Sequence, residues 1–171
     1  FQTGDAVWFC HGGLGGARGN YAEYTVLPGA EAELIPASLD FTEAAALPLV
    51  LITAWEALYD RAALSGGETV LIHAGAGGVG HVAIQLARIA GARVAATVSG
   101  PKEAEFVHSL GAEYAINYRE EDLVEAVMDW TEGRGVDVAF DTVGPGVFRA
   151  SIPAMAPYGD LVTILDPGTD I

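Results

Sequence analysis

The chain has 171 residues, 51% of them hydrophobic, which is enough to bury the core of a single domain with a small appendage. Its formal net charge of −15 repels nucleic acid and anionic membranes, and no apolar run reaches the roughly 18 residues of a membrane span, so neither partner is expected. The single cysteine, Cys10, can form no internal disulfide and supplies no multi-cysteine zinc site, which favours a reducing, cytoplasmic setting.

The first part of the chain predicts two short strands, at residues 5–9 and 21–27, joined by a glycine-rich loop at residues 12–16. This loop lacks the Gly-Lys-Ser/Thr ending of a P-loop, so we interpret it as a connection and not as a phosphate cradle. Cys10 and His11 are neighbours, but adjacent side chains of a strand face opposite ways and no second cysteine exists. Metal binding is therefore not expected there.

From Phe41 to Leu64 the pattern is helical, with an interruption near Pro48, and a regular alternation of strands and helices follows. Strands separated by helices of about 10 to 15 residues predict right-handed βαβ crossovers and a parallel sheet that is covered on both faces. The expected strands are residues 69–74, 93–98, 113–117, 136–141 and 160–165, and the expected helices are residues 78–90, 102–110, 120–131 and 146–155.

A phosphate-binding pattern follows the first of these strands. Gly75, Gly77 and Gly80 fill the motif G-x-G-x-x-G, with a buried-strand signal before them and an apolar helical stripe after them. One glycine makes the tight turn, one lets the backbone approach a pyrophosphate, and one lets the helix pack closely on the strand. The motif alone is weak in a chain with 22 glycines, but its context favours a dinucleotide site over an ordinary turn.

The end of the second strand predicts which nicotinamide cofactor binds. An NAD site usually carries an Asp or Glu about 20 residues beyond the motif. Here Ser99 and Lys102, the only lysine, occupy that place, and the first carboxylate, Glu103, lies on the next helix. Ser99 can donate to a 2′-phosphate and Lys102 can neutralise it, so we expect NADPH, unless Lys102 is only a solvated surface charge. Tyr118 or Arg119 could complete the site from the third strand.

These motifs resemble those of the zinc-free quinone oxidoreductase, or zeta-crystallin-like, branch of the medium-chain dehydrogenase/reductase superfamily. The resemblance implies a GroES-like catalytic domain followed by a Rossmann domain, with hydride transfer from NADPH to a quinone or an α,β-unsaturated carbonyl. Zinc-dependent relatives have a cysteine ligand in the segment corresponding to residues 49–52 and a four-cysteine lobe, which this chain lacks, so no metal is expected. The matching segments are residues 4–7, 21–24, 44–48, 73–80, 110–112, 116–122 and 141–144.

The resemblance also implies a domain division and a set of cofactor contacts. Residues 1–46 would be a remnant of the GroES-like domain, and residues 47–171 a truncated, doubly wound Rossmann domain with strand order 3-2-1-4-5 and the sixth strand missing. The substrate pocket would lie in absent parts, so no catalytic residue is assigned and the chain alone is expected to be inactive. The full-length protein would be a dimer. The cofactor contacts would be Thr53, Gly75, Gly77, Gly78, Val79, Gly80, Ser99, Lys102, Tyr118, Val143 and Gly144.

Two other functions remain open. One is a zinc-free enoyl-thioester reductase that uses the same cofactor, and the other is a non-catalytic NADPH-binding scaffold or sensor. His73, on the first buried strand, and His81, beside the glycine turn, favour core packing or a solvated position over general acid-base catalysis.

Overall fold

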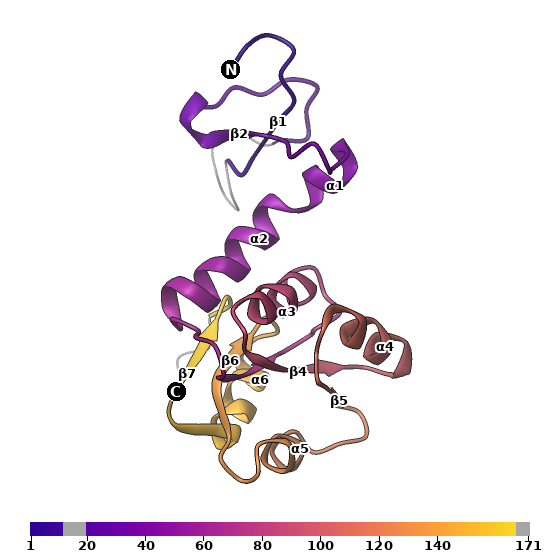
Figure 1. Ribbon diagram of the computed structural model, residues 1–171, viewed down its shortest axis with the longest axis vertical. Helices are drawn as coiled ribbons and strands as arrows, with labels where there is room; N and C mark the ends of the chain where they lie inside the picture. Colours follow the sequence, from indigo (N-terminus) through magenta and orange to yellow (C-terminus); the bar gives the residue numbers. More distant parts are fainter. Residues whose placement is uncertain (12–19, 167–171) are drawn as a thin grey trace. The chain divides into compact units, whose positions relative to one another are not determined.

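The computed structural model describes residues 1–11 and 20–166, so the predicted glycine-rich loop at residues 12–16 lies outside the described residues. The chain folds as two compact units, Phe1–Val50 and Leu51–Ile171, whose elements are labelled in Figure 1. The predicted boundary, between residues 46 and 47, falls a few residues earlier. Assignment of the first unit to a GroES-like domain stays a prediction.

The first unit contains a two-stranded antiparallel sheet, in which β1 (Val7–Phe9) pairs with β2 (Ala32–Leu34). The strand predicted at residues 21–27 is wrong, because this described segment forms no strand. Its β-forming residues are unpacked, with Tyr21 and Tyr24 almost fully exposed. Strand preference depends on packing against a neighbouring surface, so aromatic residues alone did not make this segment a strand.

Helices connect this small sheet to the second unit. The first, α1, begins with a capping box: the Asp40 carboxylate accepts from the Glu43 amide at 2.8 Å, and the Glu43 carboxylate accepts from the Asp40 amide at 3.0 Å. The helix ends before Pro48, which starts the next helix, as its fixed φ and missing N–H dictate. These elements are η1 (Gly29–Glu31), α1 (Phe41–Ala46), α2 (Pro48–Trp55) and the π-helix η2 (Glu56–Arg61).

The second unit is an α/β Rossmann-like fold around a five-stranded parallel sheet with the order β5-β4-β3-β6-β7. Counted along the chain from β3, this is the predicted order 3-2-1-4-5. The strands are β3 (Thr69–Ile72), β4 (Arg93–Val98), β5 (Tyr114–Asn117), β6 (Val136–Asp141) and β7 (Met155–Thr163). The helices are α3 (Gly80–Ile89), α4 (Pro101–Leu110), α5 (Leu123–Trp130), α6 (Pro145–Ser151) and the short η3 (Ile152–Ala154).

Helices cover both faces of this sheet. Within the unit, α3 packs beside α4 on one face, and α5 packs beside α6 on the other (Figure 1). Every residue of β3 is buried, as expected for the central strand of a doubly wound sheet. The core under α5 is built from small and branched apolar residues, namely Leu71, Ala95, Ile116, Ala126, Val127, Val136, Ala139 and Ala154.

The last helix and strand differ from the prediction. Helix α6 ends at Ser151, and β7 already begins at Met155, five residues before the predicted strand at 160–165. Proline is rare inside strands except at edges and bulges, so Pro157 concealed the start of this strand. Strand β7 has such an irregularity, because its pairing with β6 shifts register between Val136 and Val138.

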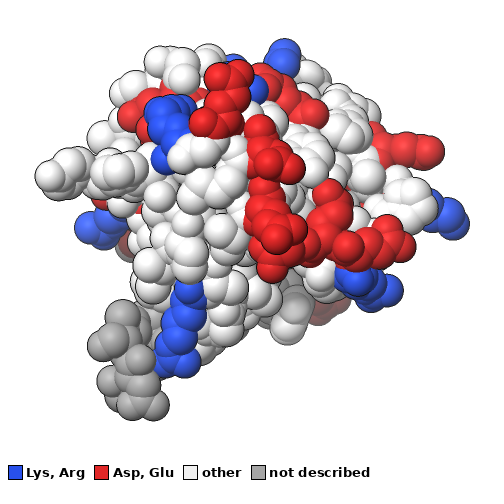
Figure 2. Space-filling view, turned by 90° about the horizontal axis from the view of Figure 1, so that it is seen from below, with Lys and Arg blue, Asp and Glu red and all other residues white. Residues whose placement is uncertain are grey.

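Acidic residues outnumber basic ones, with 23 Asp and Glu against 8 Lys and Arg. Figure 2 shows acidic side chains gathered in a band across one face, with basic side chains scattered around it. No helix in residues 1–11 and 20–166 is long and apolar enough to cross a membrane. The expectations of no nucleic-acid or membrane partner and of a cytoplasmic location stay predictions.

Candidate functional site

The G-x-G-x-x-G segment forms a tight turn between β3 and α3. Its first half is fastened to the end of β4: the Ala74 amide donates to Thr97 Oγ1 at 2.9 Å, and the Gly75 amide donates to the Thr97 carbonyl at 3.0 Å. The Gly77 amide then donates back to the Ala74 carbonyl at 2.8 Å. Gly77 and Gly78 are exposed, so the turn presents backbone to solvent directly before α3.

Two of the motif glycines are required by packing within the chain. A Cβ atom on Gly80 would lie 2.2 Å from the Ala74 carbonyl oxygen, and one on Gly75 would lie 2.7 Å from Ala96 Cβ. Any side chain at these two positions would therefore push α3 away from the turn, or the turn away from β4. This agrees with the close helix-to-strand packing that the motif predicts.

Gly77 has a different environment. A Cβ atom on it would meet only Ala74, at 3.1 Å from the carbonyl oxygen and 3.9 Å from Cβ. Its backbone conformation is not left-handed, so neither strain nor crowding inside the chain explains a glycine here as strongly as at Gly80. Close approach of a ligand to the backbone would be a further physical reason for glycine at this position.

The start of α3 provides the electrostatics of an anion site. No side chain caps this helix at its N-cap residue, Val79, although the His81 amide in its first turn donates to the Gly77 carbonyl at 3.1 Å. The aligned peptide dipoles add partial positive charge at the same end. Exposed glycine backbone directly before a helix N-terminus is the arrangement that binds the phosphates of dinucleotides, so a diphosphate site at Gly77 and Gly78 stays a prediction.

A second group of polar residues lies where β4 and β5 end. Val98 pairs with Asn117, and the Tyr118 amide donates to the Val98 carbonyl at 3.2 Å. Because β5 lies beside β4, Tyr118 and Arg119 reach the edge of the sheet where β4 ends, as the sequence predicted. Tyr118 is exposed, and the Arg119 guanidinium carbon lies 5.9 Å from the centroid of its ring.

Glu103 also belongs to this group. The sequence placed this residue on the next helix and did not predict its contact with Ser99. Its Oε2 accepts from the Ser99 amide at 2.6 Å. Hydrogen bonds from the Ser99 amide and hydroxyl lower the pKa of Glu103, and the positive charge of Arg119 lowers it further. The available signal was the four-residue spacing across a helix start, which resembles a capping box. Lys102 is exposed in the same first turn of α4.

A buried carboxylate holds the loop after β6. Asp141 Oδ1 accepts from the amides of Val143 at 2.8 Å and Gly144 at 3.0 Å, and Thr163 Oγ1 donates to Oδ2 at 3.2 Å. The neighbouring Thr142 hydroxyl donates to the His73 carbonyl at 2.9 Å, which connects this loop to the start of the glycine turn. The predicted contacts Val143 and Gly144 are therefore held beside the carboxyl ends of the central strands.

His73 is buried next to this loop, and its imidazole is uncharged at neutral pH. Burial lowers its pKa from 6.5 to about 4, and the charge of Asp141 opposes that shift only in part. Its Nε2 lies 2.8 Å from Ser151 Oγ, whose hydroxyl donates to the Val147 carbonyl. Ser151 therefore accepts from Nε2–H, which assigns the tautomer. His73 acts as a packed core residue, in agreement with its interpretation from the sequence.

Part of the chain matches a known protein family. Residues 78–164, about half of the chain, match the family model described as zinc-binding dehydrogenase. The chain belongs to this family. The match begins inside the glycine turn and ends just after β7, so it spans most of the Rossmann-like unit. With its relatives, it places the chain among the quinone oxidoreductase-like members of the medium-chain dehydrogenase/reductase superfamily.

Three relatives illustrate this placement. The chain is 37% identical over 163 residues to a protein named quinone oxidoreductase from Pseudomonas aeruginosa, covering 95% of this chain and 49% of that protein. An alcohol dehydrogenase superfamily protein from Novosphingobium aromaticivorans superposes with a TM-score of 0.93 at 43% identity, covering 100% of this chain and 51% of the other. The CurK enoyl reductase superposes with a TM-score of 0.75 at 40% identity, and the match covers 81% of this chain and 42% of that protein. The chain spans about half the length of these three relatives, or less.

The zinc that the family name implies does not fit the residues of this dehydrogenase-family chain. Among residues 1–11 and 20–166, no three His, Cys, Asp or Glu side chains are grouped so that they could hold a metal ion. Cys10 is exposed, and its neighbour His11 pairs with Glu31. The described residues therefore supply no ligand set for zinc, and the expectation of a metal-free protein stays a prediction.

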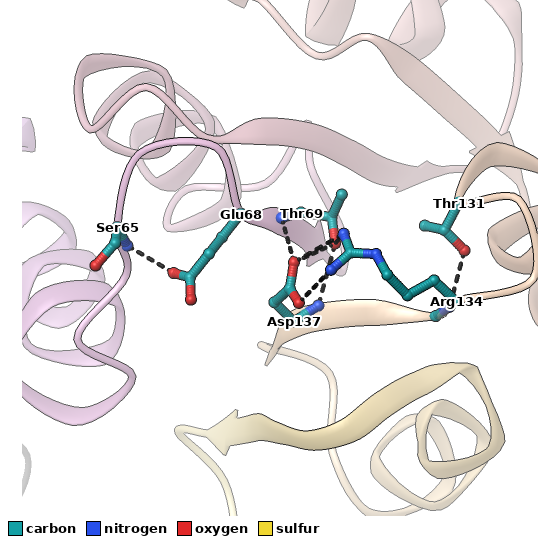
Figure 3. Close-up of polar contacts among 7 residues, drawn as sticks. Ser65, Glu68, Thr69, Thr131, Arg134 and Asp137 are labelled. Carbon is teal, nitrogen blue, oxygen red and sulfur yellow. Dashed lines mark hydrogen bonds and ion pairs between the residues drawn. The ribbon is translucent and has the colours of Figure 1, made fainter.

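The opposite end of the sheet carries a network that is structural. Asp137 Oδ2 accepts from the Thr69 amide and hydroxyl, both at 2.8 Å, and Arg134 donates to Asp137 Oδ1 at 2.7 Å (Figure 3). Burial raises the pKa of Asp137, but the bonds from Thr69 and Arg134 outweigh burial and lower it. These contacts join the amino ends of β3 and β6, whereas the glycine turn lies at their carboxyl ends.

Thr53, the remaining predicted contact, lies half-buried on α2 within the second unit. Its place in the cofactor site stays a prediction.

Proposed function

We propose that the second unit binds NADPH and that the complete protein reduces a quinone or an α,β-unsaturated carbonyl without zinc. The observation that carries this proposal is the exposed backbone of Gly77 and Gly78 at the start of α3, a helix without a side-chain cap, which would form a cradle for phosphate. Bound NADPH would supply the hydride, while the protein supplies position and electrostatics.

The diphosphate is held by backbone groups in this proposal. The amides of Gly78 and Val79 would donate to it, since the Gly77 amide is already bonded to the Ala74 carbonyl, and the dipole of α3 would stabilise its charge. Gly75 and Gly80 act indirectly, because they allow the turn and the helix to approach each other closely enough to form the cradle.

The adenosine ribose then lies at the ends of β4 and β5. Lys102 and Arg119 would provide positive charge for the 2′-phosphate, and Tyr118 would provide a hydroxyl donor. NADPH is favoured because one cation follows each of the two strand ends, Lys102 after β4 and Arg119 after β5, in a chain whose net charge is −15.

The nicotinamide end is organised by the loop after β6. Asp141 has no role in transferring a proton here, because its carboxylate is occupied by the amides of Val143 and Gly144. It keeps that loop in position beside the nicotinamide ribose, and Thr53 would contribute from α2. The substrate pocket, the proton donor and a dimer interface belong to the complete protein in this proposal.

The acceptor is proposed from the relatives. The relative named quinone oxidoreductase supports a quinone as the acceptor. The similarity to the CurK enoyl reductase supports an enoyl thioester as the second candidate. A non-catalytic NADPH-binding protein is the remaining alternative.

Titration of the chain with NADPH, followed by nicotinamide fluorescence, tests the cofactor site. We expect saturable binding with one cofactor per chain, and absence of binding would refute the proposal. The complete protein should then be assayed with NADPH against a quinone series and an enoyl-thioester series. Faster turnover of quinones supports the first candidate, faster turnover of thioesters supports the second, and binding without any turnover supports the non-catalytic alternative.

A further inference from the structure

A carboxylate lies where the adenosine ribose is proposed to bind. Glu103 is the third residue of α4, after Pro101 and Lys102, and its side chain folds back past the N-cap residue to the Ser99 amide. The distance from Oε2 to that amide nitrogen is 2.6 Å, which is short even for a hydrogen bond to a charged group. Ser99 directly follows the last residue of β4.

This position has a known chemical meaning in dinucleotide sites. A carboxylate at the end of the second strand accepts hydrogen bonds from the ribose hydroxyls of NADH and repels the 2′-phosphate of NADPH. In this chain the carboxylate comes from the following helix, but its oxygen reaches the same strand end. The Ser99 hydroxyl, the donor that favoured NADPH in the sequence, also lowers the pKa of Glu103 and so interacts with the same carboxylate.

We propose that Glu103 is a cofactor-specificity residue, whose carboxylate accepts from the ribose hydroxyls and opposes the 2′-phosphate. This inference rests on the proposed cofactor site. Lys102 and Arg119 favour the phosphate, whereas Glu103 opposes it, so the preference of the protein is set by their balance. The wild type consequently binds NADH as well as NADPH, with dissociation constants that differ by about tenfold or less.

A purely structural role for Glu103 makes a different prediction. As a helix cap, the residue would stabilise the start of α4 and affect both cofactors equally. The Glu103→Gln variant separates the two roles, because the amide oxygen can still accept from the Ser99 amide while the negative charge is lost. Its thermal unfolding should therefore stay close to that of the wild type.

The matched control is Glu105→Gln. Glu105 is exposed on the same helix, and two residues correspond to a rotation of about 200°, so it lies on another side of α4. Both variants remove one negative charge from the same helix. A change caused by net charge alone would appear in both, whereas a local effect at the ribose would appear only in Glu103→Gln.

The experiment measures dissociation constants for NADPH and NADH with the wild type and both variants at one salt concentration. We expect Glu103→Gln to shift the ratio of the two constants toward NADPH by about tenfold or more, and Glu105→Gln to shift it by less than about threefold. An unchanged ratio in Glu103→Gln, with both cofactors bound, overturns this inference and leaves the proposed function intact. Failure of the wild type to bind either cofactor overturns both.

Discussion

Burial of His73 predicts that the second unit loses stability as the pH falls below neutral. The side chain is 1% exposed and is packed between Ser151 and Thr97. Burial disfavours the charged imidazolium and lowers the pKa of His73 from 6.5 to about 4. Thr97 Oγ1 lies 3.4 Å from Nδ1, so a second proton on the ring would enter a site that is already filled.

The sign and size of the effect follow from this shift. Between the two pKa values the unfolded chain carries the proton and the folded chain does not, so acid favours unfolding. A pKa unit corresponds to about 1.4 kcal/mol, so a shift from 6.5 to about 4 amounts to roughly 3 kcal/mol in total. Roughly 2 kcal/mol of this would be lost between about pH 7 and about pH 5.

Urea unfolding at these two pH values, with the wild type and His73→Gln, measures the effect. Glutamine can donate to Ser151 without titrating, so the variant should lose about 2 kcal/mol less than the wild type as the pH falls. Equal losses for the wild type and His73→Gln would refute the reasoning, whatever the stability of the variant at neutral pH.

Further predictions concern the turn, the distant network and the metal. Gly80→Ala should destabilise the fold by about 1–3 kcal/mol in urea unfolding and weaken NADPH binding, because its Cβ would collide with the Ala74 carbonyl. Gly146→Ala is the control and should do neither, because its added Cβ would meet no neighbouring atom within 4 Å. Gly77→Asp should abolish binding in a cofactor titration without changing the circular dichroism spectrum, because a carboxylate would repel the diphosphate; retained binding would place the diphosphate elsewhere. Arg134→Met should lower the unfolding midpoint and leave the cofactor dissociation constant unchanged. Elemental analysis of protein purified without added metal should find less than stoichiometric zinc.

The sequence alone determined the central architecture of the second unit. The strands predicted at residues 93–98 and 136–141 coincide with β4 and β6. Runs of buried β-forming residues between amphipathic helices are local patterns, and local patterns can be recognised without knowing the partners. The glycine spacing is likewise local, because steric limits at Gly75 and Gly80 arise within one turn and the strand beside it.

The sequence was less informative where a strand depends on its partner. Residues 21–27 have β-forming side chains but form no strand, and all of them except Leu27 are exposed. Strand β7 contains Pro157, which argues against a strand, yet its pairing with β6 makes it one. A strand is stabilised by bonds and packing from a neighbour that can be far away in the chain, so composition alone could not decide either case.

Only the tertiary structure decided the chemistry at the edge of the cofactor site. In the sequence, Glu103 follows the second strand and belongs to the next helix, and the expected NADPH preference depended on that separation. In the folded chain the path through Gly100 and Pro101 returns its carboxylate to the Ser99 amide. His73 and Ser151, 78 residues apart, meet in the same way. Residue types and their spacing determine which elements form, whereas the contacts and burial of a charged or titratable group depend on how those elements pack.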